Sequence, residues 1–532
     1  YKGDAHLDAE VLNFKAWDGS DGFTSGEVVS ISEVGGSSAF SIGTYTAEAK
    51  NANTAPAGIA GEPINLGLVD PSLGLDYSAI VTIGDVPSDW IVNGAVHNLD
   101  GSWTVQTTNL ASLTVTTPVS YSGAYLLNVT VTAVLADGSI KTIVLGDNVE
   151  AYSPGSPIFA WSGDDFLTAS SGDDLIVFSQ PIGHDIVYSF DVAHDQIDLI
   201  SYAGFATFSD VQAHLTEDAN GNAMITLSDG QSIVLEGVHA AALAGNNFVF
   251  DQTPILHNTG TMTISDGALM PLTGTIHNAG TIALSATGHE TDLQLTQYGM
   301  TLEGGGTILL SDSDLNVISG TGSNVTLDNE DNTISGAGSL GNGELSLSNA
   351  GTINADGSHA LVIDTGLNVV ANSGTLEASG SGGLTILSAV ENSGVLWANG
   401  ANLTVQGAVT GTGNATIDGT GVLDFEASST ANVLFGAGTG GTLKLGDAFH
   451  FNGTITGFDG ADVIDLENVD SSAASISYHA NGGGTGGTLT ISDGAHTVEL
   501  SLVGNYSVDN FNLAPDHLNG TAITYLAHDL VV

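Results

Sequence analysis

Glycine and aspartate recur in one short stretch at a spacing that suits a metal ion. Residues 163–178 read GDDFLTASSGDDLIVF, in which the phrase Gly-x-Asp-x-apolar occurs twice, nine positions apart. Asp165 and Asp174 take the acidic position of the two phrases. Glycine permits left-handed turns that aim backbone carbonyls inward, and each aspartate adds a hard carboxylate oxygen. Because calcium prefers oxygen ligands of both kinds, this stretch predicts calcium binding.

The phrases that follow this stretch occur a second time far downstream. GHDIVYSFDVAHDQIDLI, ITLSDGQSIVLEGV and NNFVF lie between residues 183 and 250. GTITGFDGADVIDLENV, LTISDGAHTVELSLV and DNFNL lie in the same order between residues 453 and 513. Three aspartates match between the copies, namely Asp191, Asp195 and Asp198 with Asp459, Asp462 and Asp465. The sequence therefore predicts one module used twice.

This wording resembles the C-terminal module of RTX (hemolysin-type calcium-binding) secreted proteins. In that family glycine–aspartate turns coordinate calcium, and a D-F-x-x-G-x-D-x-I-D-L segment closes the roll against a compact β cap. The resemblance implies calcium ligands at the turn positions and in the closing segment, namely Asp165, Asp174, Asp185, Asp191, Asp195 and Asp198. It also implies an ion shared between alternate turns, which Asp165 and Asp185 could hold together.

Both copies depart from the RTX pattern. Ala169-Ser170 replaces the usual Gly-Gly, and Ser189 replaces the acid before Phe190. The second copy has GTGGTLKLGDAFHF where a nonapeptide turn would stand. These departures restrict the calcium prediction to one or two ions near residues 163–198. In the second copy we expect a metal-free cap, where three aspartates end strands and cap turns: Asp459, Asp462 and Asp465.

An asparagine phrase recurs between the two modules. It starts at Asn258, Asn278, Asn349, Asn372 and Asn392, each time as Asn-x-Gly followed by Thr or Val and an apolar residue. A period of about 20 residues with one turn and short strands is typical of a β-solenoid, in which stacked coils enclose a common apolar core. We expect each asparagine to lie in a turn and to bond the backbone or the asparagine of the next coil. Ligand binding by these asparagines is the weaker alternative.

The N-terminal third predicts strands of another kind. Residues 1–55 contain glycine-rich turns and end in NANTAPAG, which we interpret as a linker. Residues 56–152 alternate apolar and polar residues, as in a small β-sandwich with Trp90 and Trp103 in or near its core. The phrases GDVP, DGSWT and YSG resemble the cadherin-like and immunoglobulin-like repeats of large bacterial surface adhesins. Three aspartates here would bind calcium at a domain junction or fill turns: Asp70, Asp100 and Asp137.

The composition narrows the class of partner. There are 59 acidic residues against five lysines, with no arginine and a formal net charge of −54. Nucleic acid and anionic membrane surfaces are therefore excluded as partners. The chain has no cysteine, so disulfides and thiolate catalysis are excluded as well. No apolar run approaches the roughly 20 residues of a membrane span. Calcium remains the partner that this charge favours.

Catalysis finds little support in the residue pattern. Between Lys141 and Lys444 histidine is the sole basic residue type, so a polysaccharide lyase would lack its usual cations. A glycosidase could use paired acids instead. The candidates stand among turn residues, where solvated acids are expected: Asp312, Asp314, Asp328, Glu330 and Asp331. We predict that the chain is not an enzyme.

Taken together, these patterns predict an all-β extracellular protein of a bacterial surface, structural or adhesive, stabilised by calcium. The end YLAHDLVV suits either a type I export signal or a final edge strand. Two alternatives stay open: the subunit of a surface filament or S-layer, joined through a strand such as EVVSIS, and a carbohydrate-active β-helix enzyme. The predicted regions are an N-terminal β segment (1–55), a cadherin- or Ig-like sandwich (56–152), an RTX-type module (153–255), a β-solenoid (256–436) and a second RTX-like cap with its tail (437–532).

Overall fold

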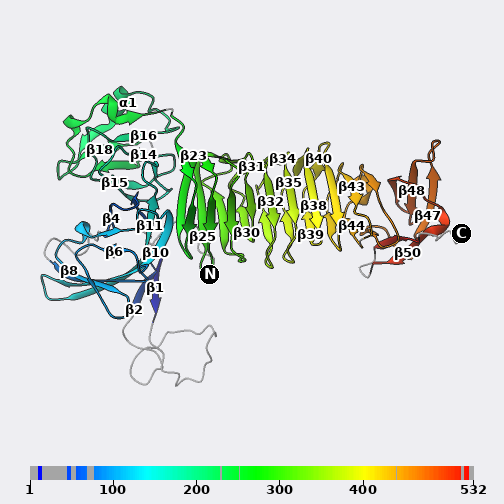
Figure 1. Ribbon diagram of the computed structural model, residues 1–532, viewed down its shortest axis with the longest axis horizontal. Coiled ribbons are helices and arrows are strands. Elements are labelled where there is room, and N and C mark those ends of the chain that lie inside the picture. The colour runs from blue at the N-terminus through cyan, green and yellow to red at the C-terminus, as the bar shows by residue number, and fades with distance from the viewer. Residues whose placement is uncertain are drawn as a thin grey trace, which may run out of the picture.

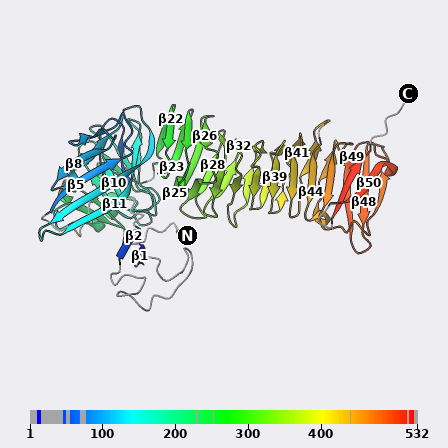
Figure 2. The ribbon, with the colours of Figure 1, turned by 90° about the horizontal axis from the view of Figure 1, so that it is seen from below.

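The computed structural model describes residues 10–14, 45–49, 55–68, 77–227, 230–250, 252–438, 440–516 and 520–526. A head, formed by the described residues of 55–152, joins a rod of stacked coils (255–466), and a small sheet closes the far end of the rod (Figures 1 and 2). The predicted all-β class is confirmed. Most of segment 1–55, the strand EVVSIS, Asp70 and the tail after residue 526 lie outside the described residues.

The rod is a parallel β-solenoid, and its central coils contribute one strand to each of three faces. Parallel coils extend over residues 158–466, beyond the predicted range 256–436. The first face contains β22 (Thr261–Ile264), β24 (Thr281–Leu284), β26 (Thr307–Leu310), β29 (Thr333–Ser335), β32 (Thr352–Ala355), β35 (Thr375–Ala378), β38 (Val395–Asn399), β41 (Asn414–Asp418), β43 (Asn432–Phe435) and β45 (Thr454–Thr456). The second contains β27 (Asn316–Gly320), β30 (Gly338–Gly341), β33 (Leu361–Ile363), β36 (Leu384–Ile386), β39 (Asn402–Val405), β42 (Val422–Phe425), β44 (Thr442–Leu445) and β46 (Val463–Leu466). The third contains β21 (Ile255–Asn258), β28 (Thr326–Asn329), β31 (Ser346–Asn349), β34 (Val370–Asn372), β37 (Val390–Asn392) and β40 (Val409–Thr410), while the long strands β23 (Leu269–Asn278) and β25 (Thr291–Glu303) run across the second and third faces.

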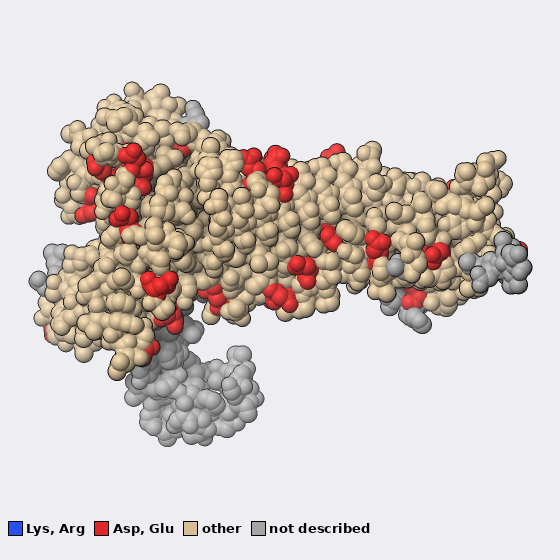
Figure 3. Space-filling model, in the orientation of Figure 1, with Lys and Arg blue, Asp and Glu red and all other residues tan. Residues whose placement is uncertain are grey.

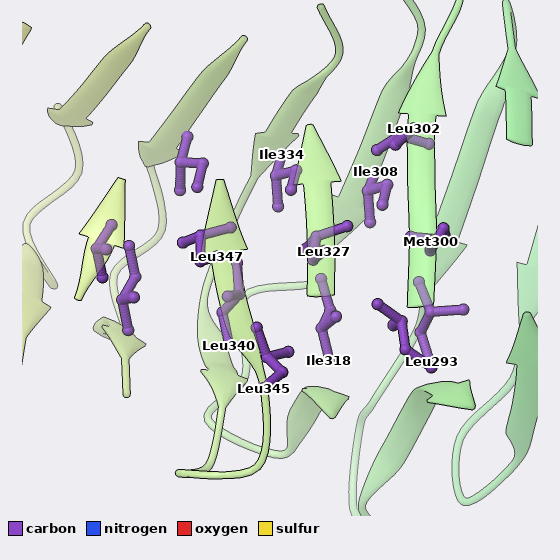
Figure 4. Close-up of a cluster of buried hydrophobic side chains, with 14 of the residues drawn as sticks. Leu293, Met300, Leu302, Ile308, Ile318, Leu327, Ile334, Leu340, Leu345 and Leu347 are labelled. Carbon is purple, nitrogen blue, oxygen red and sulfur yellow. The ribbon is translucent and has the colours of Figure 1, made fainter. Parts of the chain in front are cut away.

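Inward-facing side chains from the three faces form one apolar core. Ile353, Ile363 and Val370 belong to a single coil and have no exposed surface. Figure 4 shows how Ile, Leu and Met side chains from neighbouring coils meet inside the rod. Burying such a side chain contributes roughly 1.5–3 kcal/mol. Since one coil cannot enclose its own core, each coil depends on its neighbours for this burial.

The repeated asparagine stands at the corner between the third face and the first. The Asn349 amide donates to Asn372 Oδ1 at 2.9 Å, and the Asn372 amide donates to Asn392 Oδ1 at 2.8 Å. The predicted bond to the asparagine of the next coil is thus confirmed, but each asparagine is the last residue of its strand and not part of the turn as predicted. We call this row the asparagine ladder. The glycine two residues later packs on the coil below, because a Cβ on Gly394 would lie 2.1 Å from the Gly374 oxygen.

Residues 158–249 form a smaller unit of parallel strands beside the head, which we call the roll. One of its sheets contains β12 (Ile158–Phe159), β14 (Leu175–Val177), β16 (Gln196–Asp198) and β20 (Phe248–Val249), and the other contains β13 (Asp165–Thr168), β15 (His184–Tyr188) and β19 (Ser232–Leu235). The antiparallel strands β18 (Ala223–Thr226) and β17 (Leu215–Glu217) and the helix α1 (Phe208–His214) close its end. Among the described residues no helix has the length and apolar character needed to cross a membrane.

Three strands of the head lie between the roll and the rod in one continuous sheet, and we call this arrangement the seam. β3 (Ala55–Ile59) pairs in parallel with β13 of the roll and with β11 (Ile140–Tyr152), and β10 (Gly123–Leu135) joins β11 to β22 of the rod. The interpretation of NANTAPAG as a linker is therefore wrong for Ala55 onward, since every residue of β3 is buried. Small side chains let this strand fit between two larger units.

Replacing Gly123 by alanine is expected to destabilise the seam. Gly123 has a φ of +130°, and a Cβ there would lie 1.9 Å from the backbone oxygen of Thr263 on β22. The left-handed conformation alone costs about 1–3 kcal/mol for a residue with a side chain, and the clash adds to it. Thermal denaturation of the full chain measures this loss. Gly138→Ala is the matched control, because its φ is +81° but a Cβ would meet no atom within 4 Å. Equal melting temperatures for the two variants would contradict the prediction.

The remaining strands of the head surround their own buried cluster. β5 (Tyr77–Gly84), β8 (Trp103–Thr107) and β7 (Val96–His97) continue the sheet of β10, and β4 (Pro63–Asn65), β9 (Thr114–Thr116) and β6 (Ile91–Val92) form a separate antiparallel sheet. Trp90 is buried against Tyr121 and Tyr125, whereas Trp103 is partly buried and stacks on His97. The cadherin-like or immunoglobulin-like class stays a prediction. A separate pair, β1 (Glu10–Phe14) and β2 (Tyr45–Ala49), runs antiparallel.

The far end of the rod repeats the strand order that closes the roll. β45 pairs in parallel with β49 (Thr497–Val503), which continues into antiparallel β48 (Gly486–Ser492) and β47 (Ser475–Ala480), as β15, β19, β18 and β17 do in the roll. The copies differ in their last strands. β20 pairs directly with β16, but β51 (Thr521–Tyr525) separates β46 from β50 (Phe511–Pro515). The two modules therefore share their topology up to the last strand.

Candidate cation site in the aspartate ladders

The structure places four of the six predicted calcium ligands in two pairs, one pair at each sheet of the roll. Asp165 and Asp185 precede paired residues of β13 and β15, and we call them the Asp165 ladder. Asp174 and Asp195 precede paired residues of β14 and β16, and we call them the Asp174 ladder. Each ladder places a carboxylate at the start of a strand and the next carboxylate one coil away.

The Asp165 ladder holds two carboxylates that the protein only partly satisfies. Asp165 Oδ2 accepts a hydrogen bond from the Trp161 amide at 2.8 Å, and Asp185 Oδ1 accepts one from the Asp165 amide at 2.9 Å. The other two oxygens, Asp165 Oδ1 and Asp185 Oδ2, are buried and have no hydrogen-bond partner. Both residues are 0% exposed. Water cannot solvate them, so a proton or a cation has to balance this charge.

The electrostatics of the Asp165 ladder favour such a counter-charge. Burial raises the pKa of the Asp165 carboxyl well above its usual range, and the neighbouring Asp185 and Glu150 carboxylates raise it further. Burial likewise raises the pKa of Asp185, against the hydrogen bond that it accepts from the Asp165 backbone. Like charges one coil apart repel in a medium of low dielectric constant. A cation between the two carboxylates would offset this repulsion.

Glu150 is a third buried acid that sequence reasoning missed. It lies on β11 at the seam, 0% exposed, where its carboxylate accepts hydrogen bonds from Asn148 at 2.9 Å and Tyr152 at 3.3 Å. Burial raises the pKa of Glu150, and these two hydrogen bonds oppose the rise. An acid inside the apolar-rich end of a strand, as in DNVEAY, was the available signal. Glu150 brings the head's own negative charge next to the Asp165 ladder.

The Asp174 ladder is satisfied by protein donors. Asp174 accepts hydrogen bonds from the Ser170 amide and hydroxyl, and Asp195 accepts them from the Asp174 and Asp191 amides at 3.0 and 2.7 Å. Asp191 in turn accepts from the Ala193 amide. These contacts are those of turn-capping residues. Asp198 lies apart from both ladders, buried on β16 beside Val177.

The two histidines near the ladders lie at the surface. The His194 ring is 2.7 Å from an oxygen of Asp173, and this hydrogen bond raises the pKa of His194. The His184 ring contacts the Ser232 hydroxyl at 3.0 Å. Both positions agree with the expectation of surface or strand-end histidines.

In the second copy, Asp462 takes the place that Asp195 has in the Asp174 ladder. Asp462 accepts hydrogen bonds from the Gly441 amide at 3.1 Å and the Asp459 amide at 2.9 Å, as Asp195 does from Asp174 and Asp191. Gly441 stands where the first copy has Asp174, so no second carboxylate is present in this row. Asp465 differs from the expected turn cap, because it lies partly buried beside Lys444 on the second face.

Two of the acids weighed for catalysis, Asp312 and Asp331, accept hydrogen bonds from neighbouring turns. Asp312 accepts hydrogen bonds from the Ser358 hydroxyl at 2.5 Å and the His359 amide at 2.8 Å, which lower its pKa to about 2. Asp331 accepts from the Gly305 amide at 2.8 Å. Asp328 is paired with Thr301 and Ser348 along the third face. Asp328 therefore lies partly buried within β28 and not among turn residues as predicted, whereas Asp314 and Glu330 are exposed outside the strands, as expected.

Cation binding in the roll would depend on few side chains. Within the described residues, no three His, Asp or Glu side chains gather into a metal-binding group. A cation in the Asp165 ladder would therefore have Asp165 Oδ1 and Asp185 Oδ2 as its side-chain ligands, and carboxylate oxygens of this kind are the ligands that calcium prefers. Comparison of the chain with protein-family models, curated proteins and solved structures gives no match.

Proposed function

We propose that the chain is an extracellular structural or adhesive protein of a bacterial surface, in which calcium stabilises the roll that pairs with the head. The observation that carries the metal claim is the pair of buried, partnerless oxygens on Asp165 and Asp185. Calcium supplies a divalent charge to these oxygens when bound. The RTX resemblance of the module supports the choice of calcium over other hard cations.

The ladder positions suit a switch in folding. Asp165 lies on β13, which pairs with β3 of the head, and Asp185 lies on β15 next to it. A cation that holds the two carboxylates together would therefore also stabilise β13, the strand of the roll with which β3 of the head pairs. Calcium is scarce in an exporting cytosol and plentiful outside, so binding would favour the folded roll after export by a type I-like route.

The shape and surface support a role as a spacer. The rod separates the head from the far cap (Figure 1), and Asp and Glu lie over the head and along the rod (Figure 3). Such a surface repels other acidic molecules and stays soluble. In this proposal the head, of a cadherin-like or immunoglobulin-like class, carries the adhesive surface for a partner such as a glycan, and the rod presents it without catalysis.

A second candidate function is a subunit of a filament or surface layer. The strand β47 pairs with β48 on one side, and no described strand pairs with its other edge. An open edge can accept a strand from another copy. Regular filaments in electron micrographs of the purified chain would favour this role over the adhesive one.

Adding calcium to the metal-stripped full chain is expected to raise its melting temperature. A ligand at 100 times its dissociation constant stabilises the folded state by about 2.7 kcal/mol. Circular dichroism melts in calcium and in excess chelator, with titration calorimetry for direct binding, measure this effect. Magnesium at the same concentration is the control, since it demands a tighter octahedral site. Identical melts in calcium and in chelator would remove the metal from the proposal.

A further inference from the structure

Lys444 lies between carboxylates of three neighbouring segments near the C-terminal end of the rod. It stands on β44, in register with Asp424 on β42 and with Asp465 on β46. Its Nζ is 3.0 Å from Asp424 Oδ2 and 2.5 Å from Glu467 Oε1. Amine, carboxyl electrophile and a second carboxylate are thus in contact.

Asp424 is placed unlike a surface ion-pair partner. It is 8% exposed, although it lies outside the apolar core of the coil. Its Oδ2 faces the lysine, while its Oδ1 is buried and has no hydrogen-bond partner. A carboxylate oxygen without donors costs more free energy than a neutral amide oxygen in the same place. The site would therefore gain from the loss of this charge.

We propose that Lys444 and Asp424 form an intramolecular isopeptide bond, with Glu467 as the proton carrier. Two of the three ammonium protons move through Glu467 to Asp424 Oδ2, and the Nζ lone pair forms a bond to Cγ. The Cγ–Oδ2 bond breaks, and Oδ2 leaves with both protons as water. The third proton stays on the amide nitrogen, Oδ1 becomes the amide oxygen, and Glu467 is regenerated. No oxidant or other co-reactant is needed.

Proximity and charge set the rate of this reaction. Contact between amine and carboxyl replaces a bimolecular encounter and gives a high effective concentration. Burial raises the pKa of Asp424, which favours the neutral carboxyl that an amine attacks. Burial disfavours the Lys444 ammonium, but its hydrogen bonds with Glu467 and Asp424 outweigh this and raise its pKa. The reaction is therefore slow and occurs once, after the last coils have folded.

The bond would tie together two coils next to the end of the rod. Asp424 and Lys444 are 20 residues apart and belong to adjacent strands of the second face. A coil at the end of a solenoid has a neighbour on one side only, so the coils near an end open most easily. The chain has no cysteine, so a disulfide cannot close this loop. An amide provides the same restraint without depending on redox conditions.

The intact mass of the denatured full chain tests the proposal. We expect it to be lower than the sequence mass by one water molecule, with a branched peptide that joins the segments around Asp424 and Lys444 after proteolysis. An aspartate–glycine succinimide loses the same mass, so the digest is repeated after hydroxylamine, which opens a succinimide and spares the amide. A mass equal to that of the sequence, or a deficit without the branched peptide, overturns the proposal.

Variants separate the chemistry from the ion pair. Lys444→Arg keeps the positive charge but cannot form the amide, and Glu467→Gln keeps the shape but cannot carry the proton. The branched peptide is expected to vanish in both. Glu426→Gln is the matched control, because Glu426 acts on Asp424 only through its charge, and the peptide is expected to persist. A mass deficit that survives in Lys444→Arg would contradict the assignment.

Discussion

Replacing Asn372 by aspartate is expected to destabilise the rod by about 4 kcal/mol at pH 7, the cost of keeping an aspartate protonated about three pH units above its ordinary pKa. Asn372 is 2% exposed in the middle of the asparagine ladder. Its amide donates to Asn392 Oδ1, and its own Oδ1 accepts from the Asn349 amide. An ionised aspartate would set an oxygen against Asn392 Oδ1, so the buried carboxyl would take up a proton instead.

The pH dependence gives this prediction its sign. A carboxyl whose pKa is raised by folding binds more protons in the folded state, so its penalty grows as the pH rises above the ordinary aspartate value. Denaturant midpoints at pH 7 and pH 5 should differ more for Asn372→Asp than for the natural chain. Asn414→Asp is the control, because Asn414 is exposed at the start of β41. A midpoint that does not change at pH 7 would show that the ladder adds nothing to stability.

Replacing Asp185 by asparagine is expected to stabilise the calcium-free chain and to abolish its response to calcium. The new side chain keeps the oxygen that accepts from the Asp165 amide, and its NH₂ group replaces the buried oxygen that has no donor. An unsatisfied buried group costs on the order of 1–3 kcal/mol, and a charged one costs more. The Asp165 ladder would then carry one negative charge instead of two.

When a chelator has removed calcium, the same substitution should make the melting temperature depend less on pH. Because folding raises the pKa of Asp165 and Asp185, the calcium-free natural chain should lose stability as the pH rises above the ordinary aspartate value of 3.8. Melting temperatures between pH 4 and pH 8 measure this slope, with and without calcium. Asp195→Asn is the control, and we expect it to destabilise the chain. Both Asp195 oxygens accept from backbone amides, so an NH₂ group in place of one of them would face an N–H donor. A calcium-free Asp185→Asn chain that is less stable than the natural one would contradict the prediction.

The rod was predictable because its signal is local and repeated. The phrase Asn-x-Gly marks a corner, since the asparagine bonds its counterpart one coil away and the glycine packs on the coil below. The buried strand β3 carries no such signal. Ala55–Ile59 lacks the alternation of a strand and contains a proline, and its partner in the roll begins at Asp165. Strands so distant in the sequence pair only because the folded units bring them together, and short local patterns carry no information about that.

The site was predictable in part for a similar reason. Asp165 and Asp174 occur in the same phrase, yet only Asp165 keeps an oxygen without a donor. The residue four positions earlier decides this difference, because Ser170 offers both an amide and a hydroxyl to Asp174, whereas Trp161 offers only its amide to Asp165. A repeat pattern that aligns the aspartates treats these two positions as equal. Glu150 lies outside the repeat and enters the site only through the seam.

The seam also decides how the molecule can come apart. β3 and β11 pair with each other and, through β13 and β10, with both the roll and the rod. Removing the head would leave open strand edges on two units at once, so we expect the head to stay fixed to both of them in the folded chain. Solenoids ordinarily fray one coil at a time from their ends. Here the end of the rod next to the head is paired with β10, so we expect unfolding under mechanical load to begin at the C-terminal cap and to proceed toward the head.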